Sequence, residues 1–403
     1  MTRAPFAVIS GGGTGGHTFL ALAIARALES AGHAAQTIEL VGSRRGQEAT
    51  LLAGESFPLT LLPGRGIVRR ARPADVLANL RALGGLAWAT CREVAVFARR
   101  RPHVVVSVGG YASFPADLAA VVLGVPLVLV TVDAVPGAVH RLFARRAAAN
   151  AVAFAGTRLP RSVVTGVAVR AEITTVERTP EAAARARKEL TLPTDRVVVG
   201  VVGGSLGARR LNLAAVELAR RWAGRRDLAL YHVTGWRDWE EMVRRRGGAV
   251  GGGGAVGGGG AVGGGGSGRD PGPSHAPGPA GLVVQMVPFE SRMARLYEAV
   301  DVMVCRAGAS TIAELTVSGV PAVLVPLPGA PGDHQSANAR MLGDADAAVV
   351  VPDAACDAAT LEGVLETVLS DPGRLEKMGA AARSLGRPDA ARRVAALVES
   401  HAR

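Results

Sequence analysis

The amino-acid sequence predicts an α/β protein built of two doubly wound, Rossmann-like domains. Short apolar runs alternate with helix-forming stretches from residue 6 onward, which is the pattern of a parallel sheet covered by helices on both faces. A glycine-rich turn follows the first strand-like run in each half of the chain. The length of 403 residues is long for one core and favours two or three domains.

The first strand-like run, residues 6–10, ends in a turn of five glycines and one threonine before a helix-forming stretch at 20–28. Glycines let the backbone approach a ligand, and the N–H groups of a first helical turn favour an electron-rich oxygen. The turn has neither dinucleotide spacing nor a Walker lysine, so alone it is equally typical of a tight connection. His17 follows the turn and can accept a proton near neutral pH.

A second glycine turn, residues 109–113, follows another strand-like run and opens onto a helix. In a parallel sheet both turns lie at the same edge, where ligands bind. The apolar tract 118–132 is broken by Gly124 and Pro126 and is too short to span a bilayer, so no transmembrane segment is expected. In this half we expect further strands at 37–42, 58–62, 104–108 and 125–130, and helices at 75–101 and 116–123.

The charge and the cysteines limit the partners. The chain carries 46 basic residues and a net charge of +12, which favours an anionic partner such as a phosphate, a nucleotide or an acidic lipid. Aromatic residues make up only 4%, which argues against a nucleic-acid partner held by stacking. The three cysteines lie far apart and indicate neither a zinc site nor a disulfide framework, so a reducing cytoplasm fits best.

An arginine-rich segment lies between the third and fourth expected strands. Residues 65–101 hold nine arginines with Trp88 and aliphatic residues between them. One interpretation is a solvated helical face, which is where such charges commonly lie. The other is an interfacial surface, in which apolar side chains enter the headgroup region and arginines meet anionic lipid.

The second half repeats the strand, glycine turn and helix pattern at 196–210, after a polar, helix-forming connection at 180–195. Residues 247–281 are rich in glycine and proline, and we expect them to form a disordered surface insertion because such a composition does not offset its ordering entropy. Beyond it we expect strands at 282–287, 301–305 and 321–326 and a helix at 291–299.

Two polar turns follow strands in this half. The turn after 301–305 enters a helix on which Ser310, Thr311 and Glu314 share one face. Backbone N–H groups at such a start suit phosphate, and a nearby carboxylate suits a ribose diol. A polar helix start at 333–339 faces the same edge. The convergence of polar turns at strand ends predicts a nucleotide site.

The motifs together resemble the MurG family of bacterial N-acetylglucosaminyltransferases. They occur in the family's order and cover nearly the whole chain apart from the glycine-rich insertion. The motifs are Gly11 to His17, Gly109 to Ser113, Gly203 to Arg209, Cys305 to Thr311 with Glu314, and Asp333 to Gln335 with Asn338.

The resemblance implies a GT-B fold with a cleft between two domains. It implies an N-terminal acceptor and membrane domain over 1–175, a UDP-GlcNAc-binding domain over 176–385, and a C-terminal helix within 386–403 that packs back on the first domain. The expected reaction is inverting transfer of GlcNAc to the muramoyl 4-hydroxyl of an undecaprenyl-diphosphate acceptor, lipid I, which gives lipid II. The expected location is peripheral, on the cytoplasmic face of the plasma membrane.

The resemblance also assigns roles to single residues. His17 is the implied general base, and Arg170 stands where the family has the arginine of its Gly-Asn-Pro-Val-Arg motif. Helix N-termini and Arg170 would hold the diphosphate, so neither a metal nor a cofactor is expected. The implied substrate contacts are Thr14, Gly15 and Gly16 to a diphosphate, Ser205 to the donor phosphate, the backbone of Glu290 to uracil, Ala309, Ser310, Thr311 and Glu314 to phosphate and ribose, and Gln335 to the GlcNAc hydroxyls.

The chain departs from the family on the acceptor side. Residues 130–133 read Val-Thr-Val-Asp where the family usually has His-Glu-Gln-Asn, and His140 stands where an asparagine is usual. Asp133 therefore becomes a second candidate for the base. Two other functions stay open: a glycosyltransferase with another glycolipid or small-molecule acceptor, and a non-catalytic nucleotide-sugar-binding protein.

Overall fold

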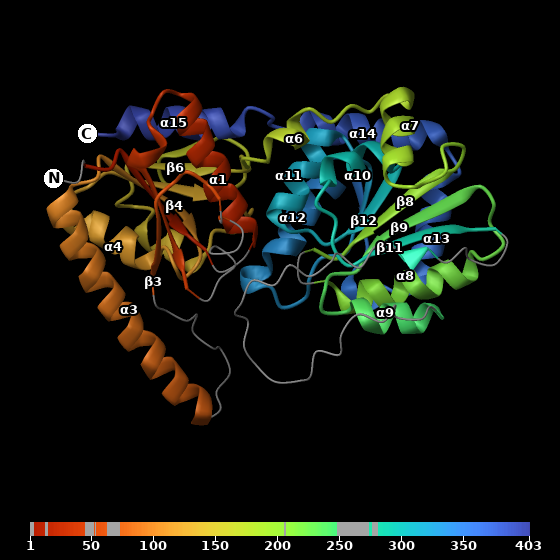
Figure 1. Ribbon diagram of the computed structural model, residues 1–403, viewed down its shortest axis with the longest axis horizontal. Helices are drawn as coiled ribbons and strands as arrows, with labels where there is room; N and C mark the ends of the chain where they lie inside the picture. Colours follow the sequence, from red (N-terminus) through yellow and green to blue (C-terminus); the bar gives the residue numbers. More distant parts are fainter. Residues whose placement is uncertain are drawn as a thin grey trace.

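The computed structural model describes residues 4–12, 15–44, 52, 54–62, 73–204, 207–247, 274–275 and 281–403. The chain folds into two lobes that lie side by side, each around one sheet (Figure 1). Thr14, Ser205, residues 63–72 of the arginine-rich segment, and 248–273 and 276–280 of the glycine-rich insertion lie outside the described residues.

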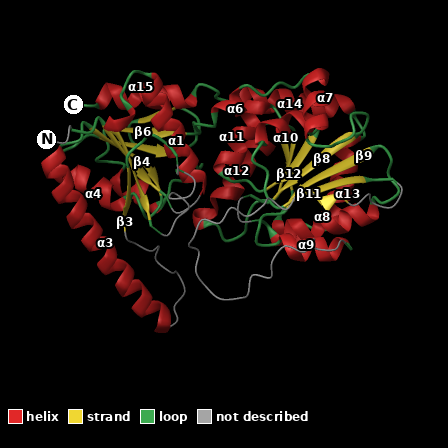
Figure 2. Cartoon of the chain, in the orientation of Figure 1, coloured by secondary structure: helices red, strands yellow, loops and turns green. Residues whose placement is uncertain are grey.

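The N-terminal lobe is a parallel sheet with helices on both faces (Figure 2). The strand order is β3-β2-β1-β4-β5-β6-β7. The strands are β1 (Ala7–Gly11), β2 (Ile38–Ser43), β3 (Leu59–Leu62), β4 (Val104–Gly109), β5 (Leu127–Thr131), β6 (Ala149–Val152) and β7 (Ser162–Val164). The helices are α1 (Gly15–Ser30), α3 (Pro73–Arg100), α4 (Phe114–Leu123) and α5 (Ala138–Phe143).

The C-terminal lobe follows two connecting helices, α6 (Ala171–Thr174) and α7 (Pro180–Glu189). Its strand order is β10-β11-β9-β8-β12-β13-β14, and only the short β10 runs antiparallel to its neighbour among the described strands. The strands are β8 (Val197–Val202), β9 (Leu228–Val233), β10 (Ser274–His275), β11 (Val283–Val287), β12 (Val302–Cys305), β13 (Ala322–Leu324) and β14 (Ala348–Val350). The helices are α8 (Arg209–Arg221), α9 (Trp239–Arg246), α10 (Met293–Ala299), α11 (Ala309–Ser318), α12 (His334–Gly343), α13 (Ala358–Leu369) and α14 (Pro372–Leu385).

The predicted fold class is confirmed, because both sheets have the doubly wound order. In each sheet the chain runs outward from a central strand, then returns to that strand's other side. The reversal lies between β1 and β4 in the first lobe and between β8 and β12 in the second. Ligands of such sheets bind beyond the carboxyl ends of the strands at this reversal.

The apolar tract 118–132 divides as the sequence predicts. Its first part ends α4, and the glycine at the helix end, Gly124, adopts φ 68° and donates its N–H to the carbonyl of Ala120. The second part is β5, a strand buried along its whole length. No helix in the described part of the chain is long and apolar enough to cross a membrane.

The last helix, α15 (Ala390–His401), returns from the C-terminal lobe to the N-terminal one. It packs against α1 and lies along β4, β5 and β6, as Figure 1 shows at the upper left. Its apolar side is buried at Val394, Ala395 and Val398. At its end His33 Nε2 and Glu399 Oε1 lie 2.9 Å apart. This helix therefore ties the end of the chain to the first lobe.

The two glycine turns of the N-terminal lobe touch each other. A methyl group built on Gly110 would lie 2.6 Å from the carbonyl oxygen of Gly12, and Gly110 has φ +85°. A side chain at Gly110 would therefore meet both backbone strain and a collision with backbone. This contact confirms the prediction that both turns lie at one edge of the sheet.

We predict that Gly110→Ala lowers the free energy of unfolding by about 2–4 kcal/mol, because strain and collision add. Gly124→Ala is the matched control: its φ is also positive, but no atom lies within 4 Å of the added methyl. The control should lower the free energy of unfolding by only about 1 kcal/mol in the same denaturant titration. Equal losses in the two variants would contradict the contact between the turns.

Candidate active site between the lobes

Four turns of small residues lie at the two reversal points. The turns follow β1, β4, β8 and β12, the central strands of the two sheets. Two of them lead into α1 and α11, whose first turns are built from Gly15 and Gly16 and from Ala309 and Ser310. Small side chains at these starts leave the N–H groups accessible to a ligand.

The starts of α1 and α11 meet across the lobe interface. A methyl group built on Gly16 would lie 3.2 Å from the Oγ of Ser310. Two helix N-termini, one from each lobe, therefore approach each other closely. Each contributes partial positive charge, so together they favour an anion such as a diphosphate.

A buried asparagine links the lobes beside these helix starts. Asn338 of α12 accepts a hydrogen bond from the N–H of Ala134 at 2.9 Å and donates to Asp133 Oδ1 at 3.1 Å. It also donates to the carbonyl of Ala307 at 3.2 Å, within the turn before α11. The carboxylate of Asp133 is thus held at the interface by a residue of the opposite lobe.

Arg170 forms a second link. Its guanidinium lies 3.2 Å from Glu314 Oε1 and 5.5 Å above the ring of Phe19 in α1. The hydroxyl of Tyr297 donates to the other oxygen of Glu314 at 2.8 Å. Burial raises the pKa of Glu314, and Arg170 and Tyr297 partly offset that shift.

Gln335 and Glu290 are held by their own lobe. Gln335 Oε1 accepts from the N–H groups of Ala307 at 3.2 Å and Leu327 at 2.9 Å, which directs its amide NH₂ away from them. The carboxylate of Glu290 is buried and accepts from the hydroxyl of Tyr231 and from Arg292. The side chain of Glu290 is therefore engaged within its own lobe.

His17 lies beside a second histidine. A methyl group built on Gly109 would lie 3.7 Å from His17 Nε2 and 3.3 Å from His140 Nε2, so both rings border one small space. His140 is 4% exposed. Burial and the proximity of His17 lower the pKa of His140 to about 4, so His140 stays neutral when His17 gains a proton.

A buried polar chain extends behind His140. Its Nδ1 lies 2.7 Å from Thr131 Oγ1 and its Nε2 lies 3.3 Å from Ser107 Oγ. Ser107 donates to Asp117 Oδ2 at 2.8 Å, and Ser10 donates to the other oxygen at 3.2 Å. Asp117 is fully buried, which raises its pKa to about 7 despite hydrogen bonds from neighbouring serines.

The structure brings most of the described candidate residues to one interface. Gly16 meets Ser310, Arg170 meets Glu314, and Asp133 meets Asn338. Glu290 stands apart from these contacts, although it follows β11 at the same edge of the sheet. Thr14 and Ser205 lie outside the described residues, so their roles stay predictions.

Sequence reasoning missed the polar chain that ends at Asp117. A signal was present: Ser10 and Ser107 each interrupt an otherwise apolar, buried strand. The two serines are direct partners in the register of β1 and β4. Tyr297 was also missed, because its pairing with Glu314 joins two different helices.

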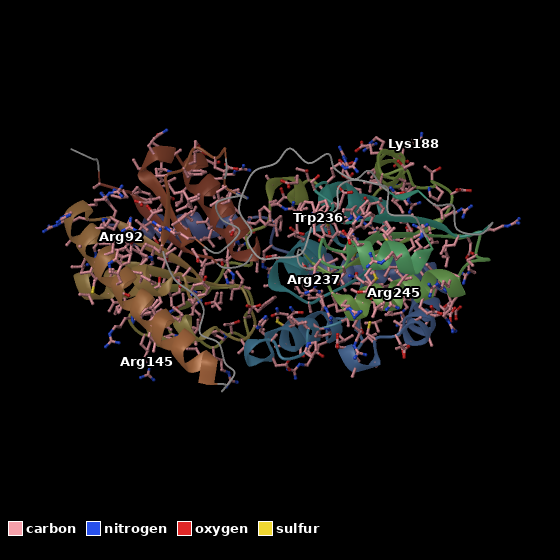
Figure 3. The ribbon with its side chains drawn as sticks, turned by 60° about the horizontal axis from the view of Figure 1, so that its bottom comes forward. Arg92, Arg145, Lys188, Trp236, Arg237 and Arg245 are labelled. Atoms are coloured by element: carbon pink, nitrogen blue, oxygen red, sulfur yellow. The ribbon has the colours of Figure 1, made fainter. Side chains whose placement is uncertain are left out.

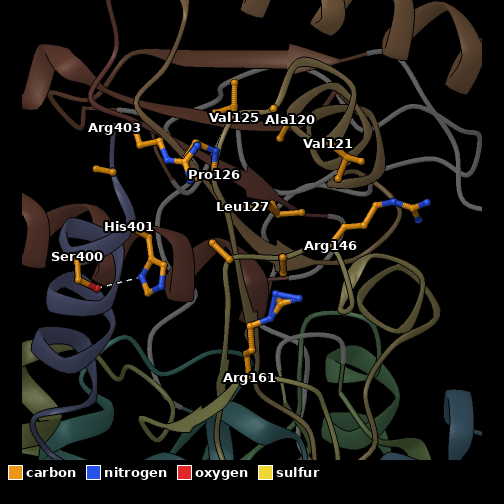
Figure 4. A pocket seen from close by; sticks show the side chains of 14 residues that line it. Ala120, Val121, Val125, Pro126, Leu127, Arg146, Arg161, Ser400, His401 and Arg403 are labelled. Atoms are coloured by element: carbon orange, nitrogen blue, oxygen red, sulfur yellow. Dashed lines mark hydrogen bonds between the residues drawn. The ribbon is translucent and has the colours of Figure 1, made fainter.

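A separate hollow of about 540 Å³ lies at the opposite edge of the N-terminal sheet, where β5 begins (Figure 4). Arg146, Arg161, His401 and Arg403 line it together with apolar residues of α4 and β5. None of the predicted site residues lies in it. The candidate site is therefore the lobe interface.

Comparison with known proteins gives two family matches and many relatives. Residues 7–152 match the glycosyltransferase family 28 N-terminal domain, and residues 198–394 match its C-terminal domain. The chain is 34% identical to a protein of Desulforudis audaxviator over 397 residues, with 97% of each chain covered. It is 35% identical to one of Moorella thermoacetica, with 95% of each covered. Both are UDP-N-acetylglucosamine–N-acetylmuramyl-(pentapeptide) pyrophosphoryl-undecaprenol N-acetylglucosamine transferases.

Solved structures agree with these matches. The crystal structure of Acinetobacter baumannii MurG superposes with a TM-score of 0.70 at 26% identity, and the alignment covers 98% of this chain and 99% of that one. The UDP-GlcNAc 2-epimerase of Neisseria meningitidis has a TM-score of 0.60 at 11% identity, with 98% of this chain and all of the other covered. At that identity the likeness is one of fold alone.

We predict that the buried Asp117 carboxyl makes stability fall as pH rises. The folded-state pKa of about 7 lies above the ordinary value of 3.8, so between these values the folded state keeps a proton that the unfolded state releases. The favourable contribution is complete below about pH 4 and is lost as pH rises through about 7. Asp117→Asn mimics the protonated group. Between about pH 5.5 and pH 8, its free energy of unfolding in denaturant titrations should therefore fall by about 2 kcal/mol less than that of the unmodified protein. Parallel stability curves would contradict the assignment.

Proposed function

The chain belongs to glycosyltransferase family 28, and from that premise we propose how its two lobes share a sugar transfer. The protein is a UDP-GlcNAc-dependent transferase. It transfers GlcNAc to undecaprenyl-pyrophosphoryl N-acetylmuramyl-pentapeptide, the step from lipid I to lipid II in peptidoglycan synthesis. The roles of single residues, given below, are the proposal.

The donor lies against the C-terminal lobe, with its diphosphate at the start of α11. Ala309, Ser310 and Thr311 supply the first-turn N–H groups and hydroxyls there. Glu314, on the same helix face, takes the ribose hydroxyls, and the NH₂ group of Gln335 takes a GlcNAc hydroxyl. The observation that supports this arrangement is the approach of Gly16 to Ser310, because a diphosphate at the start of α11 would then also lie near the start of α1.

Arg170 balances the charge of the departing diphosphate. In this structure its guanidinium is paired with Glu314. A bound donor offers it phosphate oxygens, which fit the planar guanidinium in the same two-pronged geometry as a carboxylate. Arg170 then follows the diphosphate while Glu314 is left to the ribose. Ser205, from the turn after β8, is proposed to meet the same phosphates.

His17 is the base for the acceptor hydroxyl. Its ring borders the space at Gly109, at the carboxyl end of β4 and beside the start of α1. The other candidate, Asp133, already accepts a hydrogen bond from Asn338 of the opposite lobe. An imidazole is the commonest general base in enzymes, whereas this carboxylate serves as a contact between the lobes. Asp133 is therefore proposed to help align the lobes.

The reaction is a single inverting displacement. The acceptor oxygen forms a bond to the anomeric carbon while the bond from that carbon to the UDP oxygen breaks, and UDP leaves with the electron pair. The hydroxyl proton passes to His17 Nε2. Two helix N-termini and Arg170 stabilise the charge that develops on UDP.

The N-terminal lobe is also proposed to carry the membrane-binding surface. Leu83 and Trp88 of α3 are 50% and 55% exposed, and the guanidinium of Arg92 lies 5.9 Å from the centre of the Trp88 ring. Arg92 and Arg145 both lie on this lobe (Figure 3). Exposed apolar side chains among arginines suit the headgroup region of an anionic leaflet, where the undecaprenyl-linked acceptor is found. We propose that the protein acts there peripherally, on the cytoplasmic face.

We predict that His17→Ala lowers the rate of GlcNAc transfer to lipid I by about 10²–10⁴-fold, because the general base is lost. UDP-GlcNAc affinity, measured by calorimetry, should change less than about threefold, since the donor lies on the other lobe. His103→Ala is the matched control, because His103 is exposed and precedes β4 at the opposite edge. Undiminished turnover in His17→Ala would remove His17 from this role. If the unmodified protein transferred GlcNAc to a simple glycolipid but not to lipid I, the acceptor would be a glycolipid other than lipid I.

We predict that the double variant Leu83→Ser, Trp88→Ser binds anionic vesicles at least about tenfold more weakly, because it loses the apolar part of the surface. Vesicle co-sedimentation measures this directly. The control is Trp236→Ser, since Trp236 is 54% exposed but lies on the other lobe (Figure 3). Equal binding by both variants would place the membrane surface elsewhere.

A further inference from the structure

The polar chain behind His17 is not used by the mechanism described so far. Asp117 of α4, Ser107 of β4 and His140 of α5 are each at most 4% exposed, and consecutive members are joined by hydrogen bonds of 2.8 and 3.3 Å. The chain ends at the space beside Gly109 that His17 also borders. Burying a carboxyl costs free energy, and groups with perturbed pKa values cluster at functional sites. The connection of Asp117 to the neighbourhood of a base therefore points to a function.

We propose that His140 is a positioning residue that couples the buried Asp117 carboxylate, through Ser107, to the proton-accepting ring of His17. The proposal deepens the proposed function, because it rests on His17 acting as the base. His140 does not touch the reacting atoms in this account. It transmits the effect of a charge that lies too deep in the lobe to meet the substrate.

The hydrogen bonds fix the form of His140. When Asp117 is ionised, Ser107 uses its one proton to donate to it, so the Ser107 oxygen is left to accept from His140 Nε2–H. The opposite nitrogen, Nδ1, then accepts from the hydroxyl of Thr131 at 2.7 Å. A single neutral tautomer, protonated on Nε2, satisfies every partner. The ring therefore cannot rotate without losing a buried hydrogen bond.

The polar chain supplies a negative charge that the acceptor side otherwise lacks. Residue 131 is threonine where the resembled family has glutamate, so that carboxylate is missing from the strand end. Asp117 restores a negative charge to the same lobe, two hydrogen-bonded residues behind the base. When His17 takes the acceptor proton it becomes cationic, and an ionised Asp117 stabilises that cation through the polarised chain. No net proton needs to move along the chain.

Among the described groups that face this polar chain of side chains, Asp117 is the one that can supply negative charge. Asp117 faces three hydroxyls, from Ser107 on β4, Ser10 on β1 and Ser113 before α4, and no charged group contributes to its shift. His140 faces His17 of α1, the one charged group that acts on it among the described residues. Because burial raises the pKa of Asp117 to about 7, the carboxylate forms as pH rises through neutrality.

The test compares Asp117→Asn and Ser107→Ala with the unmodified full-length protein. The first readout is the pKa of the His17 ring, followed by NMR and assigned with His17→Gln. Both variants should lower it by about 0.5–1 pH unit, because the cation loses its support. The second readout is kcat with UDP-GlcNAc and lipid I. Asp117→Asn should lower kcat about tenfold near pH 8 and less than about twofold near pH 5.5, where the carboxyl is already protonated.

Ser10→Ala is the matched control. It removes a hydroxyl from the same carboxyl but leaves the path through Ser107 intact. Its kcat should keep the rise with pH, moved to higher pH because the carboxylate loses one donor. A His17 pKa that stays within about 0.2 unit in both test variants would overturn the proposal, as would an equal loss of kcat at both pH values. If the unmodified protein transferred no GlcNAc while the pKa of His17 still shifted in both variants, the proposed function would be contradicted and the coupling would stand.

Discussion

The close approach of two helix N-termini is the constraint on which the site depends. α1 and α11 belong to different lobes, and they meet where a methyl group on Gly16 would lie 3.2 Å from Ser310 Oγ. Each helix follows the central strand region of its own sheet, so the doubly wound order of both lobes decides where these starts lie. The Asn338 and Arg170 contacts hold the lobes in this register. A sugar diphosphate beside the two starts would meet partial positive charge from both helices.

Behind this interface the N-terminal lobe buries a cluster of polar side chains. Neighbouring strands of a parallel sheet are normally apolar on both faces, yet Ser10 and Ser107 stand side by side beneath Asp117. Such a cluster is tolerated because each member has a partner, and the carboxyl stays protonated at lower pH. We infer that the cost of burial is accepted because the cluster sets the properties of His17. Stability and catalysis then respond to the same proton.

Much of this arrangement was predictable from the sequence, for physical reasons that differ between elements. Most central strands of both sheets are largely apolar runs, and the turns after β1, β4, β8 and β12 contain glycine, so the fold class and the site's edge follow from pattern alone. The pairing of His140 with Ser107, and of Tyr297 with Glu314, depends on how helices pack over the sheets. No local pattern encodes such contacts. The sequence leaves the base open between His17 and Asp133, and the contact of Asp133 with Asn338, which depends on how the lobes pack, is the reason that we propose His17.

In the proposed mechanism, one substrate lies against both helix starts. A crystal structure of the protein with UDP-GlcNAc tests this most directly. We expect the diphosphate within hydrogen-bonding distance of the N–H groups that begin α11, the ribose at Glu314, and His17 on the side of the sugar that faces away from UDP. A donor bound away from residues 309–314, or a sugar whose anomeric carbon is remote from His17, would contradict the account.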